Sequence, residues 1–259
     1  MATVTVTTNP GSNPYVNVAL TSFVESSVNV YRVDDAGNEV AVRNGDPLTL
    51  SSGAGSMQDY ETPLDVNAFW RARNSGTGAV IADSSVVQLA SGGNVYLGHP
   101  GKPTLNMQVI LADWQDGSRR TRSATFDVIG KTLPVVRSFK RAGAAGVMTV
   151  RCDDFNTLIN LNSLLDDGFP LLIRTPRTPD WGIGAKYLHI GDSDVQLRVR
   201  TPTFARRWVT LPWTEVSRPA GLAQGGPGFR WADVITTYAT WADVISNNAT
   251  WADVIDGVP

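Results

Sequence analysis

Apolar and polar residues alternate in short runs along the first hundred residues, which is the pattern of β-strands that bury one face. Residues 27–33 and 39–43 are two such runs, and Asp34-Asp-Ala-Gly37 between them has the composition of a hairpin turn. Residues 66–73 form a further run of the same kind. About seven short strands without a helical stretch predict a β-sandwich domain over residues 1–97.

The strand pattern resumes after residue 104, with one interruption. Strands are predicted at residues 105–111, 123–128, 147–151, 169–174, 187–190, 195–199 and 207–211. Within residues 155–167 four leucines recur at helical spacing, Asp154 is a candidate N-cap and Gly168 a C-terminal stop. We therefore predict a second β-sandwich domain over residues 104–220 that contains one helix.

Two segments rich in glycine and proline divide the chain. Gly98-His-Pro-Gly-Lys-Pro103 has linker composition, and we interpret residues 98–103 as the linker between the two domains. Residues 221–228 contain four glycines and a proline, which predicts a flexible tether at the start of a C-terminal tail, residues 221–259. The expected fold class is mainly β, with two β-sandwich domains, one helix and an extended repeat tail.

The sequence Trp-Ala-Asp-Val-Ile occurs three times near the end of the chain, at residues 231–235, 241–245 and 251–255. Ten residues are too few for a solenoid unit, which needs about 20 or more. A unit this short cannot bury its own tryptophan, so we expect the repeats to bury it on another surface. The candidate partner-docking residues are Trp231, Asp233, Val234, Ile235, Trp241, Asp243, Val244, Ile245, Trp251, Asp253, Val254 and Ile255.

The repeat has two local interpretations. Thr240-Trp-Ala-Asp243 fits a helix-capping pattern, so that each unit could be one helical turn, while alternation would make it a strand. Both place Trp241 and Ile245 on one face. Three weak docking units on one tether gain about 10²–10⁴ in avidity. The alternative is that the repeats fold back on their own chain or are a low-complexity expansion.

The net charge of −2 is small but unevenly placed. It gives no reason to expect a nucleic acid or an anionic membrane as partner. From Trp231 to the end there are four Asp and no Lys or Arg, whereas residues 1–230 carry 22 basic and 20 acidic groups. The N-terminal residues lack the basic start and apolar run of a signal peptide, and no segment approaches the ~20 apolar residues of a membrane span, so we expect synthesis in a cytoplasm.

Residues with catalytic or metal-binding chemistry are few and scattered. The histidines, His99 and His189, have no second ligand at metal-site spacing, and the one cysteine, Cys152, is interpreted as a buried, inert thiol. The carboxylate pairs at 153–154 and 166–167 flank the predicted helix, where capping or a solvated end explains them better than acid–base catalysis. We therefore expect no enzyme activity, no metal site and no cofactor.

The densest basic cluster consists of Arg119, Arg120 and Arg122. The plain interpretation is a solvated hairpin tip. The functional interpretation is a contact for an acidic partner surface, such as the acidic repeat tail of a neighbouring subunit.

Three motifs of the first domain resemble the fibronectin type III class of β-sandwich. They are Asp59-Tyr-Glu61 before a strand, Phe69-Trp-Arg-Ala-Arg-Asn74, and Ser84-Ser-Val-Val-Gln-Leu89, which look like the penultimate and last strands of such a domain. The resemblance implies a role in adhesion or spacing rather than catalysis, although a fold alone does not determine a function.

A second resemblance rests on residues 30–63, on the segment 158–219 with Pro170-Leu-Leu-Ile-Arg174 and Tyr187-Leu-His-Ile-Gly191, and on the repeat tail. These stretches are similar to minor tail proteins of siphophages that infect actinobacteria, whose C-termini often carry Thr-Trp-Ala-Asp-type repeats. The resemblance implies a structural virion component near the tail tip, held by subunit contacts. It implies other phage tail proteins as partners and a homo-oligomer.

A carbohydrate-binding module for adhesion to the host surface is the alternative function. Exposed aromatic side chains in a groove of either sandwich would support that alternative. An enzyme such as a glycosidase is a third hypothesis, which requires two carboxylates facing each other across a cleft.

Overall fold

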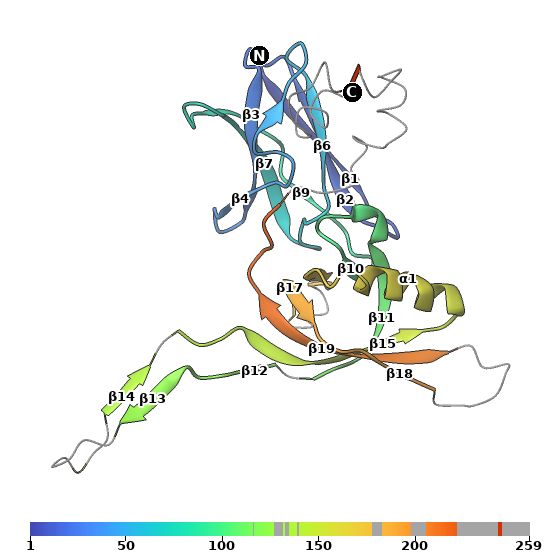
Figure 1. Cartoon of the computed structure of the whole chain (residues 1–259). Helices are drawn as coiled ribbons and strands as arrows, with labels where there is room; N and C mark the ends of the chain where they lie inside the picture. Colours follow the sequence, from blue (N-terminus) through green and yellow to red (C-terminus); the bar gives the residue numbers. More distant parts are fainter. Residues whose placement is uncertain are drawn as a thin grey trace.

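The computed structural model describes residues 1–115, 117–126, 132, 135–138, 140–177, 183–197, 206–221 and 243–244. Within these ranges the chain is mainly β with one α-helix, as predicted. It forms two units, an N-terminal unit of strands β1 to β9 and a barrel of later strands (Figure 1). In the part of the chain so described, no helix is long and apolar enough to cross a membrane.

The N-terminal unit consists of two antiparallel sheets. One has the order β1-β2-β6, and the other has the order β4-β3-β7-β8, with β5 beside β3 and β9 beside β7. Their bounds are β1 (Thr3–Asn9), β2 (Tyr15–Thr21), β3 (Ser27–Asp34), β4 (Glu39–Ala41), β5 (Leu48–Thr49), β6 (Gly55–Asp59), β7 (Asn67–Asn74), β8 (Val80–Asp83) and β9 (Val87–Gln88). The predicted hairpin turn after Asp34 joins β3 to β4, and Gly37 adopts the positive φ of 79° that such a turn requires.

The two sheets enclose one apolar core. Alternate residues point into it, such as Val18 of β2 and Trp70 of β7, both of which are 0% exposed. The buried Asp59 of β6 accepts hydrogen bonds from Trp70 Nε1 at 3.2 Å and from Arg32 Nη1 at 2.7 Å. One carboxylate therefore connects the two sheets and satisfies the indole nitrogen.

The second unit is a closed antiparallel barrel. Its strands are β10 (Val95–Gly98), β11 (Met107–Trp114), β15 (Ala144–Cys152), β16 (Leu171–Arg174), β17 (Ala185–Ile190) and β19 (Arg207–Val216). They follow one another in the order β15-β11-β10-β16-β17-β19, and β19 pairs with β15 to complete the circle. Outside the circle, β12 (Ser118–Arg119) pairs with β15 and β18 (Asp194–Gln196) pairs with β19.

The barrel corrects the prediction of a second β-sandwich. Strand β19 pairs with β15 along Arg207 to Thr214 and with β17 from Trp213 onward, so that one strand joins both edges of the sheet. A barrel strand and a sandwich strand each bury one face, and both therefore show the same alternation. The sequence pattern cannot distinguish the two architectures.

Helix α1 (Phe155–Leu165) confirms the helix predicted within residues 155–167 and its start, and it ends two residues earlier than predicted. The Asp154 carboxylate accepts a hydrogen bond from the Thr157 amide at 2.7 Å, which is the expected N-cap. Gly168, with φ 61°, follows the end of the helix as predicted. The buried leucines of the helix belong to the core of the barrel, and the short helix η1 (Pro103–Leu105) lies beside α1.

Strand β10 is shared by the two cores. Val95 and Leu97 belong to the core of the barrel, whereas Tyr96 between them belongs to the core of the N-terminal unit. Opposite Tyr96 on the neighbouring strand lies Arg174, which is 1% exposed. Its Nη1 donates to the carbonyl oxygens of Pro14 at 3.0 Å and Thr62 at 3.2 Å, both in the N-terminal unit. Burial lowers the pKa of Arg174 to about 10, so the side chain is still a cation at neutral pH.

Residues 98–103, interpreted from composition as a linker, are packed against both units. All of them except Lys102 are buried. Asn13 of the N-terminal unit donates to the Pro103 carbonyl at 2.9 Å, and the ring of His99 stacks on that of Phe169. The placement of a domain boundary in this segment stays a prediction.

A buried ion cluster forms a second contact between the units. Glu61 accepts hydrogen bonds from Arg43 Nε and from Arg218 Nε, each at 2.8 Å. Arg218 follows β19, and Arg43 Nη2 also donates to the Pro219 carbonyl at 3.0 Å. The segment that leaves the barrel after β19 is therefore held against the N-terminal unit.

We expect Arg174→Ala to lower the free energy of unfolding by about 3 kcal/mol. The substitution leaves a cavity and two buried carbonyl oxygens without their charged donor. Urea unfolding followed by tryptophan fluorescence measures the effect. Arg177→Ala, at an exposed position just beyond β16, should change the free energy of unfolding by less than about 0.5 kcal/mol. Equal stabilities of the two variants would contradict the role assigned to Arg174.

Candidate functional site

A hairpin projects from the barrel, and we call it the arm. Its described residues are 117–126, 132, 135–138 and 140–143. Strands β13 (Ser123–Phe126) and β14 (Val135–Ser138) pair antiparallel at the far end, and the Ala142 amide donates to the Arg120 carbonyl nearer the barrel. Figure 1 shows β13 and β14 extending well away from the barrel and from the N-terminal unit.

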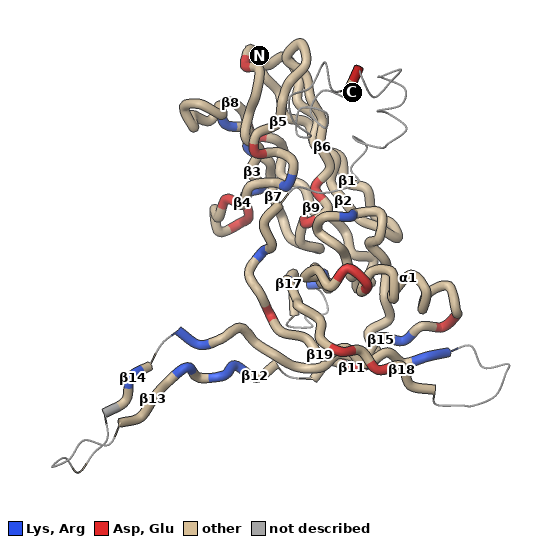
Figure 2. The backbone as a smooth tube through the Cα atoms, viewed as in Figure 1, with Lys and Arg blue, Asp and Glu red and all other residues tan. Residues whose placement is uncertain are grey.

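The arm is exposed and basic. The described side chains of the arm are exposed, apart from the half-buried Ala142. Ala144, the first residue after the arm, is buried. Phe126 is 52% exposed and Val136 is 58% exposed. Figure 2 shows Lys and Arg along both strands of the arm and no Asp or Glu among the residues drawn there. The basic residues are Arg119, Arg120, Arg122, Arg137, Lys140 and Arg141.

The arm is anchored to the barrel by a pair of stacked indoles. Trp114 and Trp213 lie with ring centroids 4.6 Å apart and planes inclined by 21°. Gly117 and Gly146 leave room for the Trp213 ring, because a Cβ on either would come within 2.8 Å of it. Gly143 is tighter still, since a Cβ there would lie 2.1 Å from the Glu215 carbonyl oxygen.

We expect Gly143→Ala to push the arm strand away from β19 and to lower the free energy of unfolding by about 1–3 kcal/mol. Thermal and urea unfolding measure the change, and amide hydrogen exchange locates it at the base of the arm. Gly191→Ala is the matched control, because the nearest atoms to its new Cβ lie at an ordinary 3.8 Å. An unchanged free energy of unfolding for Gly143→Ala would show that the arm strand can move away from β19 without loss of stability.

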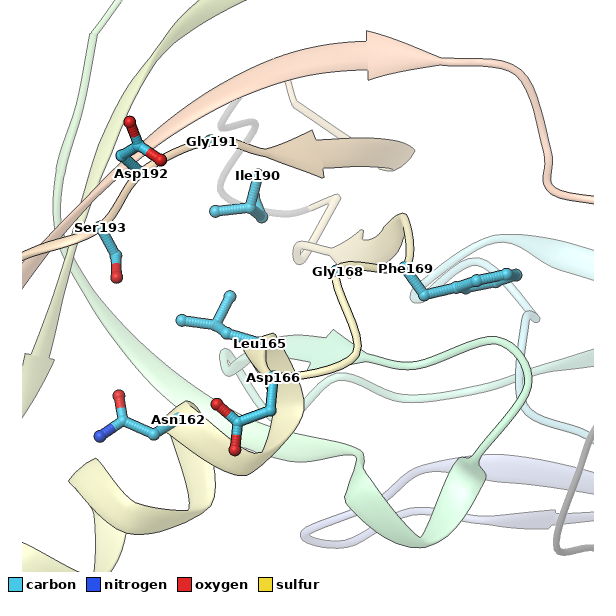
Figure 3. Close-up of a pocket in the computed structure, with 9 residues that line it drawn as sticks. All are labelled: Asn162, Leu165, Asp166, Gly168, Phe169, Ile190, Gly191, Asp192 and Ser193. Carbon is cyan, nitrogen blue, oxygen red and sulfur yellow. The ribbon is translucent and has the colours of Figure 1, made fainter.

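A polar notch of about 300 Å³ lies at the C-terminal end of α1. Its described lining is Asn162, Leu165, Asp166, Gly168, Phe169, Ile190, Gly191, Asp192 and Ser193. Figure 3 shows Asp166 and Asp192 coming from different elements, with the Phe169 ring directed away from the notch. The described lining holds two carboxylates, Asp166 and Asp192, and the Ser193 hydroxyl, but no His, Cys, Lys or Tyr.

Three of the four carboxylates that flank α1 have structural partners, and the fourth, Asp166, lines the notch. Asp153 forms ion pairs with Arg151 and Arg206, and Asp154 caps the helix. Asp167 pairs with Lys102. Cys152 is fully buried, as predicted, and burial raises the pKa of its thiol to about 11. Over the ranges that the structure describes, no three His, Cys, Asp or Glu residues gather as a metal site.

His99 is buried beside Asp167. Its Nδ1 accepts a hydrogen bond from the Gly101 amide at 3.0 Å, and its Nε2 lies 3.5 Å from Asp167 Oδ2. Its ring stacks on Phe169 with centroids 4.9 Å apart. Burial lowers the pKa of His99, although Asp167 acts in the opposite direction.

The lowered pKa of His99 predicts that stability decreases in mild acid. An unfolded histidine has a pKa of about 6.5, so the unfolded chain takes up a proton first as the pH falls below that value. The stabilising contribution is present above about pH 6.5 and is lost as the pH falls toward the lower folded pKa. Urea unfolding at several pH values should show a smaller loss for His99→Gln than for the wild type. The exposed His189→Gln should retain the wild-type pH dependence.

The structure places the three predicted basic residues together on one strand of the arm. Arg119 Nη2 lies 3.7 Å from Glu215 Oε2. The other arm cations form no ion pair with a carboxylate of the described residues. The sequence hypothesis missed Arg137, Lys140 and Arg141, which lie on the second strand of the hairpin, beside the strand that carries the first three. The available signal was the density of Lys and Arg on both sides of residues 123–138.

Most of the predicted docking tail lies outside the described residues. This applies to Trp231, Asp233, Val234, Ile235, Trp241, Ile245, Trp251, Asp253, Val254 and Ile255. Asp243 and Val244 are described, and both have helical backbone conformation. Val244 is 6% exposed, which is the burial that the fold-back alternative expects for this one residue.

A scan against protein-family models finds no match to this chain, and a search of curated proteins finds none either.

Proposed function

We propose that this chain is a structural, non-enzymatic subunit of a bacteriophage tail tip, a minor tail protein that assembles by docking to other tail proteins. The resemblance to minor tail proteins of actinobacterial siphophages supports the assignment from the sequence. The proposal places the protein in the virion, as one of several copies.

The arm is the observation that carries the proposal. An isolated two-stranded hairpin is at best marginally stable in water. The described part of the arm contributes no residue to either apolar core, and it exposes Phe126 and Val136 together with six cations. A projection of this kind serves a subunit that is covered by a neighbour after assembly, because exposed apolar side chains and free strand edges favour association.

The arrangement of the two units supports a spacer or connector. The two facing sheets of the N-terminal unit fit a fibronectin type III-like β-sandwich, which we include in the proposal. The units share β10 and are further joined by Arg174 and by the Glu61 cluster. A rigid connection of this kind would hold the partners bound to the two units at a fixed distance and orientation.

The repeat tail supplies the second docking element of the proposal. Each unit presents a tryptophan and an isoleucine, and burial of such side chains contributes about 1.5–3 kcal/mol or more per side chain before ordering costs. Val244 is buried within the chain, so docking has to release that residue from its intramolecular position.

The carbohydrate-binding alternative has less support from the described residues. Trp213 is 3% exposed and stacked on Trp114, and Phe169 stacks on His99. Trp213 is thus withdrawn from the surface and one face of the Phe169 ring is covered, which leaves little aromatic surface at these two positions for a sugar ring.

Deleting residues 222–259 tests the proposal. Both cores lie before residue 222, so the shortened chain should still unfold cooperatively, with a midpoint lowered by only a few degrees through the lost burial of Val244. Incorporation into tails should fall by about 10²-fold or more, the lower end of the expected avidity. The measurement is complementation of a phage that lacks this protein, with tails counted by electron microscopy. Normal tails built with the deleted chain would contradict a docking tail.

A further inference from the structure

The far end of the arm has one face on which an aromatic ring and a cation lie together. In the β13–β14 pair, Ala124 lies opposite Arg137, and Phe126 is two residues further along the same strand. Side chains two residues apart share a face, and a diagonal cross-strand neighbour is within reach of a long side chain. Phe126 and Arg137 therefore share one face of the arm.

Further cations lie along the arm toward the barrel. Arg120 and Arg122 are on the first strand, and Lys140 and Arg141 are on the second. The hydrogen bond from the Ala142 amide to the Arg120 carbonyl keeps the two strands together there. The described part of the arm thus carries six basic residues and no acidic residue, in a protein whose net charge is −2.

The C-terminal segment of the same chain has the complementary composition. Residues 231–259 contain four Asp, no Lys and no Arg, and each repeat adds a tryptophan and an isoleucine. An aspartate beside large apolar side chains matches a surface on which Arg137 lies beside the exposed Phe126. Arg–carboxylate and aromatic contacts are the interactions expected of such a pair.

The position of the last described residue before the tail favours a contact between copies. Gly221 is held at the N-terminal unit, where Arg43 Nη1 donates to its carbonyl oxygen. Figure 1 shows that the N-terminal unit and the β13–β14 end of the arm lie at opposite ends of the molecule. A tail that starts at one end and a receptor at the other fit a head-to-tail arrangement of subunits.

We infer that the arm is the docking site for the acidic repeat tail of a second copy of this chain. The inference rests on the proposed function and names the partner of the docking tail. A head-to-tail contact of this kind is heterologous, and repetition of it closes a ring or extends a filament. A nucleic acid is the less suitable occupant, because the net charge of the chain is −2 and acidic residues are spread over both units (Figure 2).

Sedimentation velocity of the full-length chain tests the inference. The wild type should self-associate at micromolar concentration, and the dissociation constant should rise about tenfold between low and high salt, because the charges are exposed. Arg122→Glu with Arg137→Glu should weaken self-association by about tenfold or more. The control, Arg177→Glu with Lys186→Glu, changes the net charge equally on the barrel side and should associate like the wild type.

Mixing two defective variants identifies the contact as intermolecular. The second variant carries Asp233→Lys, Asp243→Lys and Asp253→Lys in the tail. Alone it should be monomeric, yet mixed with the arm variant it should form a 1:1 complex, because one partner retains the native arm and the other the native tail. A chain carrying both sets of substitutions should associate again through exchanged charges. A misfolded arm cannot produce this restoration.

Three results would overturn the inference. The first is a wild type that stays monomeric at every salt concentration, which would indicate a contact within one chain. The second is an arm variant that associates as strongly as the wild type. The third is tight binding of a DNA oligonucleotide that the arm variant loses, without any self-association. If self-association fails these tests while deletion of residues 222–259 still abolishes tail assembly, the proposed function stands and this inference alone is wrong.

Discussion

Strand β10 is the element on which the rest of the structure depends. Its alternate side chains enter two different apolar cores, so neither unit can move relative to the other without exposing Tyr96 or Leu97. The same strand positions Arg174, a buried cation that donates to two carbonyl oxygens of the other unit. Desolvating a guanidinium is costly, and its hydrogen bonds must be retained to compensate. This combination favours a single relative orientation of the units.

Because the two units have a fixed relative orientation, the arm projects from the molecule in a defined direction. The arm is rooted where Trp114 stacks on Trp213 and where three glycines allow strand and ring to approach closely. Trp213 is part of β19, which closes the barrel and then runs into Arg218 at the Glu61 cluster. The base of the arm is thus connected through one strand to the point where the chain leaves the barrel for its tail. An exposed hairpin on such a base keeps a defined position relative to the barrel, although none of its described residues belongs to an apolar core.

The sequence predicted features that depend on neighbouring residues. The helix at 155–165 with its Asp154 cap, the turn after Asp34 and the buried Cys152 follow from spacing or local composition, and the structure confirms them. The closed barrel was not predictable in this way, because closure depends on pairing between β19 and β15, a strand far away in the sequence. Arg174 ended a predicted strand, but only the packing of two units reveals its burial. The complete basic arm likewise requires the pairing that brings Arg137 opposite Ala124.

The strength of individual contacts explains why one arm would be matched with three repeats. An exposed ion pair contributes only about 0.2–1 kcal/mol, and one tryptophan pays for part of the ordering of its own peptide. A single repeat on a single arm therefore exchanges readily. Ten residues span at most about 33–36 Å, so successive repeats can reach separate arms only where subunits are packed closely. Weak single contacts allow a wrongly placed subunit to leave, and the combined contacts hold only when several neighbours are in position, which is the behaviour that an ordered assembly requires.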